Sequence, residues 1–242
     1  MGDCVRIPRR GEGARQVIIF ATDPHIKDDS RLDFIRCWCR YVTGARPDTL
    51  ILGGDFFDPW QAPWRDILAL QAWAEVQTMI RNRDDAGLPT YYIRGNHDHD
   101  CPQIDGAEMV NKVIIDGWEF RHGWERDPVW KYAGISRIAF WIADHCPSLM
   151  LPIYKALYPT PAASLQVVSK SSFDALEVAE QWTLHTGGIH LLWRQHADSV
   201  GRRVCIGHTH CLWIDPLVCD GGSLSYGQWL EIDGEKVSVK TL

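Results

Sequence analysis

The sequence predicts an α/β fold in which two packed β-sheets lie between layers of helices. Three observations lead to this fold class. The first half of the 242 residues alternates apolar runs with amphipathic segments in the order β-α-β-α-β, which favours a largely parallel sheet covered by helices. Two later hairpin signals, each an Asp-Gly pair, indicate antiparallel or mixed pairing. Polar groups follow most of the expected strands, which favours a ligand site at one edge of the sheets.

Three buried strands and two helices are expected in the first half. Continuous apolar and β-branched runs predict strands at 16–23, 48–55 and 89–97. Helical spacing of apolar residues predicts helices at 30–44 and 64–87. Ser30 is expected to cap the first helix, and Gly44 is expected to end it.

The second half of the chain has a different pattern. Hairpins are expected around Asp116-Gly117 and Asp233-Gly234, and a short strand is expected within 203–210. The stretch 124–200 is aromatic and helix-like, with little strand character. We therefore expect a helical insertion or cap there, ahead of the last polar motif.

The termini and the overall length indicate one domain. A chain of 242 residues is long enough for a single large domain with a substantial core, and we expect the domain to span 1–242. Residues 1–15 are polar and basic, so a flexible N-terminus is expected there. No apolar segment follows them that would make a signal peptide.

Composition narrows the class of protein. Hydrophobic residues make up 45% and charged residues 23%, the balance of a soluble globular protein. The net charge of −6 gives no general electrostatic reason for nucleic-acid binding, although a local basic groove is compatible with it. No apolar run approaches the roughly 18 residues that cross a bilayer. The eight scattered cysteines favour free thiols in a reducing cytosol, so a cytoplasmic protein is expected.

Groups that bind metals or move protons follow five of the expected strands. The motifs are Asp23-Pro24-His25, Gly53-Gly54-Asp55, Gly95-Asn96-His97-Asp98, His122-Gly123 and Gly207-His208-Thr209-His210. Imidazole and carboxylate ligands suit Zn, Mn, Fe or Co, and a carboxylate can bridge two ions. Two such ions about 3.5–4 Å apart clamp the attacking and leaving oxygens of a phosphoryl transfer. The motifs together predict a two-metal site for that chemistry.

This series of motifs resembles the calcineurin-like metallophosphoesterase superfamily, from about residue 16 to the end of the chain. Within it, the stretch RHGWERD, the helical stretch before GHTH and the tail DGGSLSYGQWLEIDGEKVSV look most like the UDP-2,3-diacylglucosamine pyrophosphatase group. The resemblance implies a four-layer α-β-β-α sandwich of two mixed sheets. It also implies two divalent ions at the strand ends, with manganese preferred and iron, zinc or cobalt as alternatives.

The resemblance also implies a role for each motif residue. Asp23, His25 and His210 would hold one metal ion, Asn96, His122 and His208 would hold the other, and Asp55 would bridge the two. His97 would protonate the leaving group or stabilise charge in the transition state, and Asp98 would orient His97. A metal-bound hydroxide would attack phosphorus in line.

Three departures from the pyrophosphatase pattern bear on the substrate. His97 stands where the pyrophosphatases often have arginine, Trp124 follows His122-Gly123 where Asp or His is usual, and Pro24 takes an aliphatic position. None removes a metal ligand. The first two weaken the assignment of a lipid-precursor substrate.

Several functions are compatible with these motifs. The leading one is hydrolysis of a phosphoester or pyrophosphate bond in a phosphorylated small molecule or a lipid-linked substrate, such as UDP-2,3-diacylglucosamine. The alternatives are a nuclease or cyclic-nucleotide phosphodiesterase on the same centre, and a non-catalytic interaction module.

The aromatic part of the insertion raises the question of membrane contact. It is expected either to pack helices onto the core or to form an apolar groove for an acyl chain or for the inner face of a membrane. Its aromatic residues are Trp130, Tyr132, Phe140, Trp141 and Tyr154, and its basic residues are Lys131, Arg137 and Lys155. Such a mixture suits the headgroup level of an anionic membrane.

Overall fold

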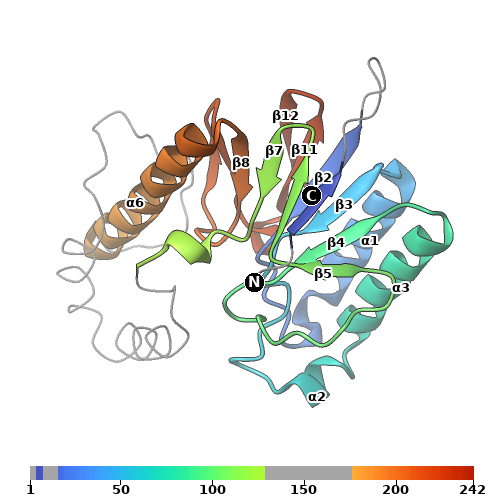
Figure 1. The fold of residues 1–242 in the computed structure, drawn as a ribbon. Helices are drawn as coiled ribbons and strands as arrows, with labels where there is room; N and C mark the ends of the chain where they lie inside the picture. The colour runs from blue at the N-terminus through green and yellow to red at the C-terminus, as the bar shows by residue number, and fades with distance from the viewer. Residues whose placement is uncertain (1–3, 8–15, 129–175) are drawn as a thin grey trace.

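The computed structural model describes residues 4–7, 16–128 and 176–242, with the first part of the last range, 176–186, described as backbone only. These residues form two six-stranded sheets packed face to face. Helices α1 and α3 cover the outer face of one sheet, and α6 covers the outer face of the other (Figure 1). The predicted α/β fold, two mixed sheets flanked by helices, is confirmed.

The first sheet, called sheet B, has the order β12-β11-β2-β3-β4-β5. Its strands are β2 Val17–Ala21, β3 Thr49–Leu52, β4 Thr90–Ile93, β5 Glu108–Val110, β11 Gln228–Asp233 and β12 Lys236–Thr241. Strands β2 to β5 run parallel, while β11 pairs antiparallel with both β2 and β12. The three predicted strands and the second hairpin therefore lie together in one mixed sheet.

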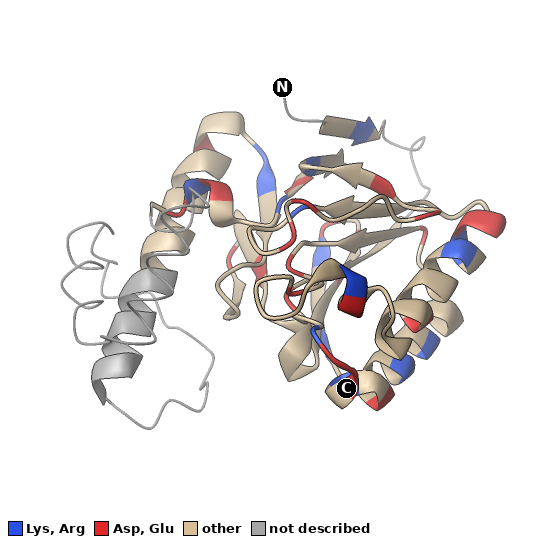
Figure 2. Cartoon of the chain, turned by 90° about the horizontal axis from the view of Figure 1, so that it is seen from below, with Lys and Arg blue, Asp and Glu red and all other residues tan. Residues whose placement is uncertain are grey.

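Helices α1 (Leu32–Ala45), α2 (Trp64–Ile67) and α3 (Gln71–Asp85) lie between these parallel strands in the sequence. The apolar side of α1 buries Ile35 and Trp38, and that of α3 buries Val76 and Ile80, against the outer face of sheet B. Their outer faces carry mixed charges (Figure 2).

The predicted ends of the first helix were wrong. The helix continues through Gly44 to Ala45, and Arg46 takes the left-handed conformation after it, with φ of 47°. Ser30 does not cap it. A 3-10 turn, η1 (Asp29–Arg31), comes first, and the Asp28 carboxylate accepts a hydrogen bond from the Ser30 backbone N–H at 2.8 Å.

The second predicted helix is two helices, α2 and α3. The Asp29 carboxylate accepts hydrogen bonds from the backbone N–H groups of Gln71 and Ala72, at 3.2 and 2.9 Å. The first N–H groups of a helix lack partners inside it, so a distant carboxylate that accepts from them favours a new helix start at Gln71. Sequence spacing alone contains no sign of that contact.

The second sheet, called sheet A, has the order β1-β6-β7-β8-β10-β9. Its strands are β1 Cys4–Ile7, β6 Lys112–Ile115, β7 Trp118–Phe120, β8 Arg203–Ile206, β9 Leu212–Ile214 and β10 Val218–Gly221. Strands β6 and β7 form the predicted hairpin around Asp116-Gly117. Phe20 and Ile51 of sheet B meet Phe120 and Cys205 of sheet A in a buried core between the two sheets.

Two further expectations concern the flexible N-terminus and the helical insertion. A flexible segment was expected over 1–15, but Cys4–Ile7 form edge strand β1, parallel to β6, because Val5 and Ile7 pack on the core between the sheets. The end of the expected insertion is helix α6 (Leu176–Val200), which contacts β8 and β10, while η2 (Trp124–Arg126) precedes it. The aromatic groove and the membrane contact proposed for Trp130 to Tyr154 lie outside the described residues.

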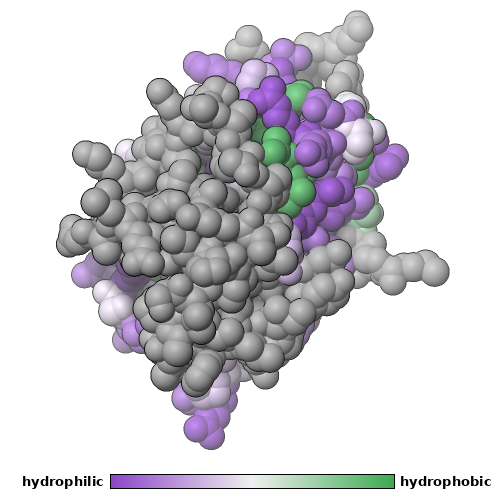
Figure 3. Space-filling model, turned by 90° about the vertical axis from the view of Figure 1, so that its left-hand side faces the viewer, coloured by the Kyte–Doolittle hydropathy of each residue, from purple (hydrophilic) through white to green (hydrophobic). Residues whose placement is uncertain are grey.

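The described surface is mainly hydrophilic. On the side of α6, the described residues in view are mostly polar, with a small hydrophobic group (Figure 3). The large hydrophobic side chains that are exposed come from separate elements, and they are Leu68, Ile214, Tyr226 and Leu242. Among the described helices, none combines the length and apolar character of a membrane span.

Candidate metal centre

The predicted ligand residues come two or three positions after the ends of five strands. Asp23 follows β2, Asp55 follows β3, Asn96 follows β4, His122 follows β7 and His208 follows β8. Because β2, β3 and β4 are parallel neighbours, as are β7 and β8, each set of strand ends meets at one edge. Packing of the two sheets then brings both sets of loops together.

The backbone at these positions is unusual. Of the seven described non-glycine residues with positive φ, five are predicted ligands: Asp23 (57°), His25 (47°), Asp55 (49°), His208 (69°) and His210 (56°). The left-handed region costs a residue with a side chain on the order of 1–2 kcal/mol, and such strain gathers at functional sites. Here the tight turns direct each polar side chain toward the space between the sheets' edges.

The side chains form three groups whose ligand atoms lie within 4.8 Å of one another. The groups are Asp23 with His25 and His210, Asp55 with His122 and His208, and His25 with Asp55 and His97. The Nε2 atoms of His25 and His210 are 3.0 Å apart. Asp55 Oδ2 lies 3.3 Å from His122 Nε2 and 3.9 Å from His25 Nε2, so this one carboxylate faces both sets of donors.

Asn96 completes the second set. Its Oδ1 atom lies 3.2 Å from His122 Nε2, and the residue is 4% exposed. The other ring nitrogen of His122, Nδ1, lies 2.9 Å from the Gly53 carbonyl oxygen, which fixes the ring so that Nε2 faces the site. All seven predicted metal ligands are thus gathered in one volume.

Asp23 Oδ1 tests whether the site fits a cation. This atom is buried, and no hydrogen bond from the described residues reaches it. Three imidazole Nε2 atoms surround it, from His210 at 3.4 Å, His25 at 3.8 Å and His122 at 3.9 Å. A buried carboxylate oxygen without a hydrogen bond is costly, whereas a cation between it and the imidazoles would satisfy all of them. The donor set of carboxylate, imidazole and amide oxygen fits divalent transition metals.

Charge is concentrated in this volume. Burial alone would raise the pKa of Asp23, but the charges of His122 and His210 outweigh burial and lower that pKa to about 2. Burial alone would lower the pKa of His122, but Asp55 and Asp23 outweigh it and raise that pKa to about 10. Burial lowers the pKa of His25 to about 4, so this imidazole is neutral and ready to act as a ligand.

His97 lies at the side of the ligand cluster. Its backbone N–H donates to Asp55 Oδ1 at 2.8 Å, and its Nε2 atom lies 3.9 Å from Asp55 Oδ2. Its ring stacks on Trp60, with centroids 3.9 Å apart, and its Nδ1 atom lies 3.0 Å from Asp58 Oδ1. The ring is therefore held from two sides while Nε2 faces the cluster.

The expected role of Asp98 needs correction. The carboxylate on His97 Nδ1 belongs to Asp58, and Asp98 is instead buried beneath the loop. Asp98 accepts hydrogen bonds from the backbone N–H groups of Phe56 (2.7 Å) and Gly95 (2.8 Å) and from the Tyr92 hydroxyl. Asp98 thus links the loop that carries Asp55 to the loop that carries Asn96, so its role is structural. The resemblance implied a different partner, since Asp98 turns away from the ring that it follows and Asp58 contacts that ring.

Two buried carboxylates near the centre were missed at the level of sequence. Asp58 follows Asp55 by three positions, and Asp127 follows His122 by five. Asp127 is fully buried, and its Oδ2 atom lies 2.9 Å from His208 Nε2. An imidazole that donates from Nε2 to this carboxylate carries its lone pair on Nδ1. The only signal in the sequence was the acidic character of FFD and ERD, which is common in loops.

Comparisons with known proteins show the family of the chain. The model of the calcineurin-like phosphoesterase family matches residues 17–237. The chain is 26% identical over 99 residues to the DNA double-strand break repair protein Mre11 of Aeropyrum pernix, a match of 40% of this chain and 23% of that protein. The chain thus spans less than a quarter of the length of this relative.

Comparison with solved structures gives matches of low identity, each with a TM-score below 0.5. A novel archaeal phosphodiesterase has a TM-score of 0.42 at 15% identity, over 93% of this chain and 99% of that chain. A dimetal phosphatase of Danio rerio has a TM-score of 0.41 at 10% identity, over 93% and 98%. The nuclease MPE of Pseudomonas putida has a TM-score of 0.36 at 18% identity, over 46% and 56%. On the family match over residues 17–237, the chain belongs to the calcineurin-like phosphoesterases, a family of metal-dependent phosphoester hydrolases.

Proposed function

We propose that the protein hydrolyses phosphodiester or pyrophosphate bonds with two divalent metal ions, manganese being the preferred metal. The observation that carries the proposal is the position of Asp55, whose Oδ2 atom faces His25 on one side and His122 on the other. A single carboxylate between two donor sets is the arrangement that bridges two ions. Asp23, His25 and His210 would hold one ion, and Asn96, His122 and His208 the other.

The chemistry that a bound pair of ions supplies is Lewis-acid activation of water and of the phosphoryl group. The protein's own residues supply the proton. His97 Nε2 faces the cluster while Asp58 and Trp60 hold the ring, so His97 is placed to protonate the leaving oxygen. Asp58 is the positioning residue for that step, in place of Asp98.

The preferred substrate is a nucleotide-linked or lipid-linked diphosphate such as UDP-2,3-diacylglucosamine. The support is the likeness of RHGWERD and of the C-terminal stretch to the pyrophosphatase group. We place the reaction in the cytoplasm, where the seven described cysteines, all of them free thiols, would remain reduced.

Hydrolysis assays test the proposal. Purified protein with Mn²⁺ should hydrolyse bis-p-nitrophenyl phosphate and UDP-linked sugars, and Asp55→Ala and His97→Ala should each remove most of the activity. An Asp105→Asn variant is a matched control, because Asp105 is exposed and, among the described residues, pairs with Arg81. Full activity of His97→Ala on every substrate would exclude the proton-donor role.

A nuclease or cyclic-nucleotide phosphodiesterase on the same centre is the second candidate. The observation that favours it is the 99-residue similarity to a DNA repair protein. Against it, the net charge is −6, and Lys and Arg are interspersed with Asp and Glu on the described elements (Figure 2). Digestion of single- and double-stranded DNA, beside hydrolysis of UDP-glucose and of a cyclic nucleotide, separates the candidates.

A further inference from the structure

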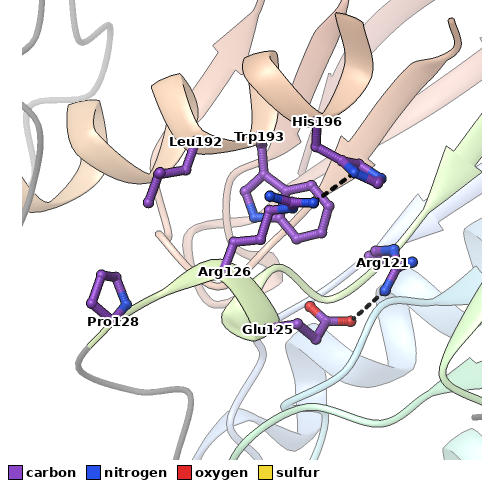
Figure 4. A pocket seen from close by; sticks show the side chains of 7 residues that line it. All are labelled: Arg121, Glu125, Arg126, Pro128, Leu192, Trp193 and His196. Atoms are coloured by element: carbon purple, nitrogen blue, oxygen red, sulfur yellow. Dashed lines mark hydrogen bonds and ion pairs between the residues drawn. The ribbon is translucent and has the colours of Figure 1, made fainter. Parts of the chain in front are cut away.

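A polar cavity apart from the ligand cluster lies between helix α6 and the turn η2. Its volume is about 590 Å³. Seven side chains line it, and they are Arg121, Glu125, Arg126, Pro128, Leu192, Trp193 and His196 (Figure 4). None of them is among the proposed metal ligands. The pocket therefore supplies no ligand to the proposed metal ions.

Two guanidinium groups share one aromatic ring in this pocket. The Cζ atom of Arg126 lies 5.4 Å from the centre of the Trp193 ring, and that of Arg121 lies 5.7 Å from it. Trp193 itself is almost fully buried, so its ring is a fixed wall. Each contact is a favourable cation–π interaction, but together they bring two like charges to one place. The repulsion from Arg121 adds to burial in lowering the pKa of Arg126.

The two guanidinium groups of the pocket have different partners. Arg121 is neutralised by Glu119, whose carboxylate lies 2.5 Å from Arg121 Nε, and it also meets Glu125 at 3.4 Å. Arg126 donates to His196 Nδ1 at 2.8 Å, a neutral acceptor. Among the described residues, no carboxylate oxygen lies within 4.0 Å of the Arg126 guanidinium. Glu119 and Glu125 act on the Arg126 guanidinium only through longer-range attraction, so no described carboxylate contacts it directly.

The pocket borders the His122-Gly123 motif of the metal centre. Arg121 directly precedes His122, and the indole N–H of Trp193 donates to the Gly123 carbonyl oxygen at 2.9 Å. Gly123 in turn lies against His208, since a Cβ added to it would sit 3.2 Å from the Cβ of His208. The backbone of Gly123 thus lies between Trp193 and the proposed metal ligand His208.

We propose that this pocket binds a second phosphate group of the substrate, one joined to the phosphate that is hydrolysed at the metal centre. Arg126 would pair with the phosphate, since a guanidinium fork matches two phosphate oxygens at once, and Arg121 would add a second positive charge nearby. Leu192 and Pro128, which line the pocket, offer apolar surface to the group attached to that phosphate. The inference rests on the proposed phosphoesterase function and specifies its substrate as one with at least two phosphates.

Arg126→Gln tests the pocket directly, because it removes the charged guanidinium and keeps a polar, uncharged side chain. Arg194→Gln is the matched control. Arg194 is an exposed arginine of helix α6. It lies outside the pocket and pairs with Asp215 at 3.1 Å. Both variants lose one positive charge, so a general electrostatic effect would appear in both.

The first readout is binding without catalysis. Inorganic diphosphate is titrated calorimetrically into full-length protein freed of divalent ions by chelator. Arg126→Gln should bind the diphosphate about tenfold more weakly than the wild type, as loss of a charge-assisted hydrogen bond requires, while Arg194→Gln should bind like the wild type. Equal binding by wild type and Arg126→Gln would overturn the proposal, and this holds even if no hydrolytic activity is found.

The second readout is the substrate preference of the Mn²⁺-loaded enzyme. The ratio of kcat/KM for UDP-glucose to kcat/KM for bis-p-nitrophenyl phosphate, which has one phosphate, should fall about tenfold in Arg126→Gln. A thymidine dinucleotide with a 5′-phosphate is tested in parallel. A fall for UDP-glucose or for the dinucleotide supports the pocket and identifies the source of the second phosphate. An unchanged ratio for both substrates would contradict it.

Discussion

The Nδ1 atom of His97 lies 3.0 Å from Oδ1 of Asp58, and the His97 ring stacks on the ring of Trp60. Asp58 is fully buried, and its other oxygen accepts from the Gln61 side-chain amide at 2.5 Å. The carboxylate is therefore fixed, and it fixes which His97 nitrogen can carry a proton toward the cluster. This relationship makes Asp58, three residues beyond Asp55, the partner of the proposed acid.

Asp58→Asn should slow hydrolysis in a way that depends on the leaving group. We expect kcat to fall on the order of tenfold to a hundredfold for an alkyl or nucleoside leaving group, a part of what a positioned acid contributes. The loss should be smaller for p-nitrophenolate, which leaves without a proton. Steady-state rates on both kinds of ester check this, with Asp100→Asn, in the exposed loop beyond the motif, as control. An equal loss on both esters would contradict an acid role for His97.

Asp127→Asn should weaken metal binding. The Asp127 carboxylate lies 2.9 Å from His208 Nε2, and loss of such a partner of a metal-binding imidazole lowers affinity by about tenfold to a hundredfold. Titration calorimetry with Mn²⁺ measures the affinity, and circular dichroism confirms that the variant is folded. Unchanged Mn²⁺ affinity in a folded variant would show that Asp127 does not position His208.

Gly95→Ala should disrupt the centre through steric contact. A Cβ at residue 95 would lie 2.1 Å from Asp55 Oδ1 and 2.4 Å from the Asp55 backbone nitrogen. We expect the free energy of unfolding to fall by about 1–3 kcal/mol and activity to be lost with the displaced Asp55.

Gly44→Ala is the matched glycine control for that variant. Gly44 lies in α1 with nothing within 4 Å of an added Cβ, so this change should stabilise the protein by about 0.5–1 kcal/mol. Urea denaturation measures both variants. A Gly95→Ala protein as stable and active as the wild type would refute the close approach to Asp55.

Tyr41→Phe should alter stability in alkaline solution. The Tyr41 hydroxyl donates to Glu231 Oε2 at 2.9 Å and links α1 to β11. Burial and the Glu231 charge raise the pKa of Tyr41 to about 12. Because the pKa of Tyr41 is raised in the folded state, its hydrogen bond contributes fully to stability below pH 10, near the pKa of about 10 in the unfolded chain. This contribution to stability is lost as the pH rises toward 12.

The stability gap between wild type and Tyr41→Phe should therefore narrow above pH 10. At pH 8 the variant should be less stable by about 1 kcal/mol, the net value of one hydrogen bond. Urea denaturation at pH 8, 9, 10 and 11 gives the gap at each pH. A gap that stays constant over this range would mean that Tyr41 titrates normally in the folded protein.

Much of the fold and the position of the ligands could be predicted because they depend on local pattern. Buried parallel strands such as β2 and β3 are continuous apolar runs, and the polar residues that end them, Asp23 and Asp55, must meet at one edge. Strand β1 could not be predicted in this way. Its Cys4–Ile7 stretch is short, half-exposed at the sheet edge, and stabilised by the distant strand β6.

The residues that support the ligands were harder to predict, because their partners are distant in sequence. His190 on α6 lies 3.0 Å from Asp220, and Asp220 also accepts from Thr209 between the two histidines of the GHTH motif. No sequence period connects these positions. The assignment of Asp98 as the partner of His97 failed for the same reason, since contact across a loop places Asp58 on the His97 ring.

The central claim is that one chain binds two divalent ions through Asp55, and counting bound manganese tests it most directly. Protein dialysed to equilibrium with Mn²⁺ is analysed for metal content by mass spectrometry, as wild type and as Asp55→Asn. Two ions per wild-type chain and at most one per Asp55→Asn chain are expected, because Asp55 Oδ2 faces both donor sets. Fewer than one ion per wild-type chain, or two ions in Asp55→Asn, would contradict the account.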